Sequence, residues 1–127
     1  MATVNATAGK NAVDVQGDGS CLLWEFTPLT TTNADSAPID YTQWGDMSVQ
    51  VRGTWGAGGA LAIEGSNDGT NYVVLNSAQG TALSLSADSL KQIVERPRYV
   101  RARVTGGDGT TSLAATFVFR RATPMRT

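Results

Sequence analysis

The stretch RYVRARVTGGDGTTSLAATFVFRR, residues 98–121, decides the fold class. Apolar and polar residues alternate through both of its halves, which is the pattern of a β-strand with one buried face. The residues expected on the buried faces are Val100, Ala102, Val104, Leu113, Ala115, Phe117 and Phe119. Between the halves, Asp108-Gly109 is a strong hairpin signal, because both residues accept the positive φ angles of a tight turn. We therefore expect two antiparallel strands that pair as a hairpin.

Further strand patterns precede this stretch, and glycine, proline and short polar residues separate them. The expected strands are residues 12–16 (at a sheet edge), 20–29, 39–44, 46–55, 60–66, 71–76 and 81–86. Many short strands without a long helix are typical of an antiparallel sandwich or barrel. We predict an all-β fold, an antiparallel two-sheet β-sandwich that is jelly-roll-like or immunoglobulin-like, with about eight or nine short strands. Residues 1–127 form one domain in this prediction, and residues 1–11 and 121–127 are loosely held arms.

Three local expectations follow from turn and breaker residues. Pro28 ends the strand in residues 20–29, since proline cannot donate a hydrogen bond to a sheet. Residues 30–38 form a loop rich in turn formers. Residues 87–96 form either a short helical turn capped by Asp88 or a strand, and the pattern leaves both open.

Composition narrows the function classes. The chain has ten basic and eleven acidic residues, a net charge of −1 and no histidine. The balanced charge gives nucleic-acid binding no support, and the lack of histidine removes the commonest acid/base group and metal ligand. No catalytic or phosphate-binding motif is present, so we expect no enzyme activity, no cofactor and no metal. No segment is long and apolar enough for a membrane span or a secretory signal, which favours a soluble protein made in the cytoplasm.

The stretch GSNDGTNYVVL, residues 65–75, raises the choice between a turn and a binding loop. Asp68-Gly69 suits a tight turn, as Asp108-Gly109 does, and turn chemistry alone explains both. A calcium loop needs several acidic oxygens at alternate positions, whereas Asp68 is the one carboxylate here. We interpret both pairs as turns and keep cation binding and glycan contact as alternatives for the first.

Tryptophans and arginines supply the candidate partner interface. Trp24 lies in an apolar strand and is expected in the core, as is the lone cysteine, Cys21. Trp44 and Trp55 lie near strand ends, where an exposed role is more plausible. The candidate basic strip comprises Arg96, Arg98, Arg101, Arg103, Arg120 and Arg121, and all of these but Arg96 are candidate interface residues. It is interpreted either as a solvated sheet face or as a docking strip for an acidic protein surface.

The patterns EGSNDGTNYVVL, residues 64–75, and PRYVRARVTGGDGTTS, residues 97–112, carry a resemblance that spans residues 61–117. They resemble small structural proteins encoded beside the major capsid protein in tailed bacteriophages, which include capsid decoration (cement) proteins. The resemblance implies a virion β-sandwich that binds the outer head lattice as a dimer or trimer. Its partner is then the major capsid protein, and it holds neighbouring capsid subunits together against the internal pressure of the genome. The virion is assembled in the host cytoplasm. The alternatives are a glycan-binding module for host attachment and a head-completion or tail-tube component.

Overall fold

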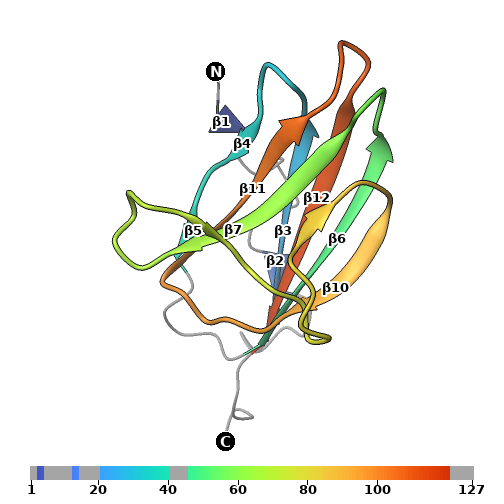
Figure 1. Cartoon of the computed structure of the whole chain (residues 1–127). Coiled ribbons are helices and arrows are strands. Elements are labelled where there is room, and N and C mark those ends of the chain that lie inside the picture. Colours follow the sequence, from blue (N-terminus) through green and yellow to red (C-terminus); the bar gives the residue numbers. More distant parts are fainter. Residues whose placement is uncertain (1–2, 5–12, 15–20, 41–45, 121–127) are drawn as a thin grey trace, which may run out of the picture.

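The computed structural model describes residues 3–4, 13–14, 21–40 and 46–120. Within these residues there is no helix, and so none that could cross a membrane. Their strands form two sheets that pack face to face (Figure 1). The longer strands are β3 (Cys21–Leu29), β6 (Asp46–Thr54), β7 (Ala60–Ser66), β10 (Ser89–Ile93), β11 (Tyr99–Gly106) and β12 (Ser112–Arg120). The two-residue strands are β1 (Thr3–Val4), β2 (Val13–Asp14), β4 (Asp35–Ser36), β5 (Ile39–Asp40), β8 (Val73–Val74) and β9 (Ser84–Leu85).

The first sheet, here sheet A, has the order β1-β4-β11-β7-β8, with β5 also paired to β11 and β9 to β7. The second, sheet B, has the order β10-β6-β12-β3-β2. All pairs are antiparallel except β1 with β4. The predicted all-β antiparallel sandwich is therefore confirmed, and short extra strands raise the strand count to twelve in the described residues.

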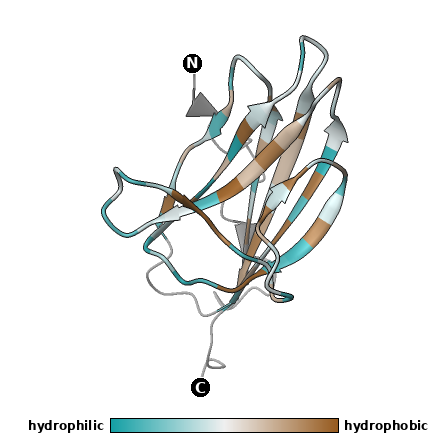
Figure 2. Cartoon of the chain, viewed as in Figure 1, coloured by the Kyte–Doolittle hydropathy of each residue, from teal (hydrophilic) through white to brown (hydrophobic). Residues whose placement is uncertain are grey.

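The core lies between the sheets and is built from the alternating apolar positions of the long strands. Figure 2 shows hydrophobic and hydrophilic residues alternating along these strands. The rings of Phe26 and Phe117 meet edge to face, with centroids 6.1 Å apart and planes at 81°. All the residues predicted for the buried faces of residues 98–121 are buried. Trp24 packs against this core from a partly buried position.

The predicted hairpin between β11 and β12 does not form. β11 pairs with β7 in sheet A, whereas β12 lies between β6 and β3 in sheet B. Residues 107–111 therefore cross from one sheet to the other at the loop end of the sandwich (Figure 1). Alternation identifies the buried face of each strand, but strands on opposite sides of one core show the same pattern as strands in a hairpin.

Two local expectations need correction, and the alternative left open for residues 87–96 is decided in favour of a strand. β3 continues through Pro28 to Leu29, because the register with β12 shifts there and proline is tolerated at such a bulge. Residues 30–38 are not entirely loop, since Asp35–Ser36 pairs with β11 as β4. Residues 89–93 are strand β10, not a helical turn, because the exposed edge of β6 offers them a full set of pairing partners.

Candidate functional site

The outer face of sheet A carries a buried carboxylate between two arginines. Glu64 on β7 stands opposite Arg101 on β11, and Arg103 is the next outward-facing residue of β11. Arg101 Nε donates to Glu64 Oε1 at 2.9 Å, and Arg103 donates to Oε2 through Nη2 at 2.8 Å and to both oxygens through Nε at 3.1 Å. The Glu64 side chain is only 4% exposed, so the two guanidinium groups and their surroundings cover it almost completely.

The charges of this cluster shift one another's titration. Burial raises the pKa of Glu64, but the hydrogen bonds and positive charges of Arg103 and Arg101 together outweigh it, so the net pKa is lowered. The hydrogen bond to Glu64 raises the pKa of Arg103. The Tyr72 ring covers Arg101, whose Cζ lies 3.8 Å from the ring centroid, and burial raises the Tyr72 pKa. Glu64 is therefore ionised near neutral pH and is held in place by its hydrogen bonds to the two arginines.

The same face continues to a second arginine–tyrosine pair. Arg98 lies over the ring of Tyr99, with Cζ 5.0 Å from the centroid. Its Nε is 3.8 Å from Asp40 Oδ2, and more than half of the Arg98 side chain is exposed. We call this outer surface, which comprises Glu64, Tyr72, Arg98, Tyr99, Arg101 and Arg103, the arginine–tyrosine face.

The arginines singled out in the sequence do not make one basic strip. Arg101 and Arg103 lie on sheet A and Arg98 directly precedes β11, each within reach of a carboxylate, whereas Arg120 ends β12 in sheet B. The expected hairpin placed Arg101 and Arg103 beside the residues of β12. The two strands lie in different sheets, so this neighbourhood does not exist. Arg121 lies outside the described residues.

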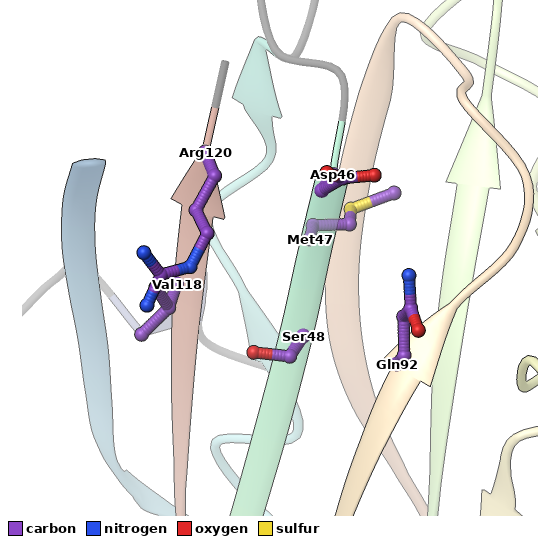
Figure 3. A pocket seen from close by; sticks show the side chains of 6 residues that line it. All are labelled: Asp46, Met47, Ser48, Gln92, Val118 and Arg120. Atoms are coloured by element: carbon purple, nitrogen blue, oxygen red, sulfur yellow. The ribbon is translucent and has the colours of Figure 1, made fainter. Parts of the chain in front are cut away.

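Arg120 lines a hollow of about 240 Å³ at the end of sheet B (Figure 3). The hollow is lined by Asp46, Met47, Ser48, Gln92, Val118 and Arg120. Asp46 stands opposite Arg120 in the strand register, and its Oδ1 lies 3.9 Å from Arg96 Nη2. Figure 3 shows the Arg120 side chain extending along β12 toward Val118 and away from Asp46. The lining of the hollow thus combines one guanidinium and one carboxylate with polar and apolar side chains.

Trp55 is less available to a partner than its position in the sequence indicates. It is partly buried and packs against the core. Its Nε1 donates to Asp88 Oδ1 at 2.8 Å, and Gly53 N donates to the same oxygen at 3.2 Å. Asp88, considered in the sequence as a helix cap, instead braces the end of β6. Trp44 lies outside the described residues.

Asp68 is bonded within its own loop, which joins β7 to β8. Oδ1 accepts hydrogen bonds from Ser66 Oγ, Thr70 N and Asn71 N, each at 2.8 Å, and Oδ2 accepts one from Asn71 Nδ2 at 2.9 Å. These bonds, led by the Asn71 backbone N–H, hold the Asp68 pKa well below its usual range. Gly69 has a φ of 77°, a conformation that suits glycine. The carboxylate thus fixes the chain reversal between β7 and β8.

Asp108 connects two loops, the one between β11 and β12 and the one between β6 and β7. Oδ1 accepts bonds from Thr110 N and Oγ1, and Oδ2 accepts one from Ala57 N at 2.9 Å. These hydrogen bonds lower the pKa of Asp108 to about 2. The bond from the Thr110 hydroxyl contributes most, and the bond from the Ala57 N–H is second. Next to Asp108, Gly109 has open space where a side chain would begin. Asp108 therefore holds residues 107–111 against the loop that follows Trp55.

The described part of the chain holds no group of three or more His, Cys, Asp or Glu side chains placed to bind a metal ion. Sequence reasoning missed three residues that organise these surfaces: Glu64, Tyr72 and Asp88. Glu64 stands among apolar residues in a strand, which is a weak signal of a paired buried charge. Its arginine partners depend on the β7–β11 register, which no local pattern specifies.

The comparisons with known proteins bear on the fold. No family model matches the chain, and no curated protein matches it by sequence. The crystal structure of the SPBc2 prophage-derived protein YomS has a similar fold, with a TM-score of 0.57 and 9% sequence identity. The match covers 78% of this chain and 93% of that chain. This sandwich is therefore shared with a prophage-derived protein.

Proposed function

We propose that the protein is a structural component of a tailed-bacteriophage virion, and specifically a decoration protein on the outer surface of the capsid. In this role it acts by binding the major capsid protein and bracing the lattice against genome pressure, without catalysis.

The observation that carries the proposal is the sandwich shared with a prophage-derived protein over 78% of this chain and 93% of that one. The resemblance of residues 61–117 to phage virion proteins supports the same origin independently, since it rests on sequence patterns and not on the fold. The shared fold supports a phage origin, and the resemblance adds the virion and, within it, the capsid surface.

The arginine–tyrosine face is the capsid-binding surface in this proposal. Arginine and tyrosine are enriched among residues that dominate binding energy at protein interfaces. Arg101 is already held by Glu64 and Tyr72, so a partner has less side-chain freedom to immobilise there. Arg98, with 53% of its side chain exposed, remains available for carboxylate groups of a neighbouring capsid subunit.

Sedimentation with phage heads tests the proposal. Purified protein is mixed with heads that lack it, the heads are pelleted, and the bound fraction is measured against protein concentration at several salt concentrations. We expect saturable binding with a fixed number of copies per head. Protein that stays in the supernatant at every salt concentration refutes the proposal, and binding to isolated tails or connectors instead of heads refutes the capsid-surface role.

A matched pair of variants tests the face. Arg98→Ala removes an exposed arginine from the arginine–tyrosine face, and Arg52→Ala removes one from sheet B, where Arg52 pairs with Glu25 at 3.3 Å. We expect Arg98→Ala to weaken head binding about tenfold, equivalent to about 1.4 kcal/mol, and Arg52→Ala to leave it within about twofold. Equal effects of the two variants contradict the assignment of the face.

A further inference from the structure

A further hollow, of about 430 Å³, lies between the loop that follows β7 and the connection from β10 in sheet B to β11 in sheet A (Figure 1). Its volume is within the range of about 300–1,000 Å³ that is usual for small-molecule sites. The polar residues of its lining are Ser66, Asn67, Asn71, Asn76, Glu95 and Arg96. None of them belongs to the arginine–tyrosine face, so the hollow is a separate surface of the protein.

Glu95 is held in place by one neighbouring residue. Its Oε1 accepts a hydrogen bond from Asn76 N at 2.7 Å, and its Oε2 accepts one from Asn76 Nδ2 at 2.6 Å. Burial raises the pKa of Glu95, but the hydrogen bonds from Asn76 and from its own backbone outweigh it, so the net pKa is lowered. Glu95 therefore presents a negatively charged acceptor at a fixed position near neutral pH.

Two asparagines of the loop after β7 are each held through one atom of the side-chain amide. Asn67 Oδ1 accepts a hydrogen bond from Arg98 N, and Asn71 Nδ2 donates one to Asp68 Oδ2, each at 2.9 Å. Among the described residues, no group bonds Asn67 Nδ2 or Asn71 Oδ1. Because both amides are oriented before a ligand arrives, binding immobilises little additional side-chain freedom.

The lining combines donors with acceptors, and its charges cancel. Asn67 Nδ2 and the guanidinium of Arg96, whose side chain is 62% exposed, are donors, whereas Asn71 Oδ1 and Glu95 are acceptors. A hydroxyl group both donates and accepts, so neighbouring hydroxyl groups suit this set. The Glu95 carboxylate disfavours an anion, and one carboxylate is too few for a calcium site. The chemistry of the lining therefore favours a neutral ligand that carries several hydroxyl groups.

Apolar side chains lie beside these polar groups. Val73, Leu75 and Pro97 line the same hollow, and Val73 is 69% exposed. A sugar ring carries C–H groups as well as hydroxyl groups, and covering Val73 with them removes apolar surface from water.

We propose that this hollow binds a neutral saccharide. Its hydroxyl groups bond to Asn67, Asn71 and Glu95, and its ring lies against Val73. Glycan contact, an alternative that the sequence left open for this loop, then involves the asparagines and not Asp68, whose oxygens are bonded within the loop.

The site is open, and the described part of its lining has no aromatic ring. We therefore expect a Kd of about 1 mM for a single saccharide. Saccharide binding is a function additional to the proposed capsid role. It is tested on the free protein, so its failure leaves the capsid proposal untouched.

NMR titration of the isotope-labelled protein tests the proposal. The probes are D-glucose, D-galactose, D-mannose, L-rhamnose and N-acetyl-D-glucosamine, each raised well above the expected Kd. We expect at least one of them to shift the side-chain amide signals of Asn67 and Asn71 saturably, and we expect glycerol and the anion glucuronate to leave them unchanged. The proposal is overturned if none of the five sugars shifts these signals, or if glycerol or glucuronate shifts them as strongly.

Three variants locate the site. Asn67→Asp keeps the oxygen that accepts from Arg98 N and replaces the Nδ2 donor with an acceptor, so we expect it to weaken saccharide binding about tenfold. Gln50→Glu makes the same exchange on an exposed residue of β6 outside the hollow, and we expect it to change the affinity less than about twofold.

Arg96→Ala removes the second donor at an exposed position, where folding is not at risk, and we expect it to weaken binding about threefold. An unchanged melting temperature verifies that each variant is folded. Saccharide binding that survives both Asn67→Asp and Arg96→Ala, or that Gln50→Glu weakens equally, overturns the assignment of the hollow.

Discussion

Replacing Glu64 with glutamine tests the interpretation of the arginine–tyrosine face. The substitution keeps the shape of the side chain and removes its charge, which leaves Arg101 and Arg103 without their carboxylate. Breaking a fully buried ion pair from one side costs about 3–5 kcal/mol. Arg101 and Arg103 remain 22% and 37% exposed, so water compensates for part of the loss. We therefore expect Glu64→Gln to lower the free energy of unfolding by about 2 kcal/mol and the melting temperature by about 8 °C.

Urea denaturation followed by tryptophan fluorescence measures this change. Glu25→Gln is the matched control, because Glu25 also faces an arginine across a sheet, but Arg52 is 61% exposed. We expect the control to lose less than about 0.5 kcal/mol, as exposed ion pairs do. The folded-state pKa of Glu64 is lowered, so its contribution is complete above about pH 4.3 and is lost as the pH falls through the folded-state pKa. A loss below about 0.5 kcal/mol for Glu64→Gln at neutral pH refutes the reasoning.

Three further predictions concern the core and the loops. Phe117→Ala costs about 3–5 kcal/mol in urea denaturation, since Phe117 is fully buried against Phe26; a loss under about 1 kcal/mol contradicts the packing described. The Asp108 pKa is lowered to about 2, so its stabilising contribution is present above about pH 4 and is lost between pH 4 and pH 2. Asp108→Asn removes this part of the acid sensitivity in pH-dependent melting, and an identical pH profile for variant and parent argues against it. Asp68→Ala lowers the melting temperature and leaves head binding unchanged, because the carboxylate is bonded within its own loop; selective loss of binding with unchanged melting speaks for a binding loop instead.

The sequence was informative where burial alone sets the pattern. Alternation predicted the inward positions of β11 and β12, because each of these strands has one face on the core. It did not predict that β11 and β12 lie in different sheets, since both bury their apolar faces in the same core. The brace between Asp88 and Trp55 joins residues 33 positions apart, and local pattern holds no information on such a contact.

The pairing of Glu64 with Arg101 and Arg103 was hidden for a related reason. The sequence shows charged residues on two separate strands, and only the strand register decides which of them meet. The arginines were identified as candidates from their spacing alone. Their actual partners, and the resulting loss of a uniform positive strip, depend on contacts across 37 and 39 residues of chain.

The place of β12 in sheet B has a consequence for biosynthesis. The strand lies between β6 and β3, which have no pairing with each other in this sheet, yet it is made after both of them. During translation, the edges of β3 and β6 that will pair with β12 therefore stay unpaired until residues 112–120 leave the ribosome. Translation that stops before Ser112 leaves a nascent chain with two open strand edges and a bare apolar face, a product suited to chaperone capture and degradation.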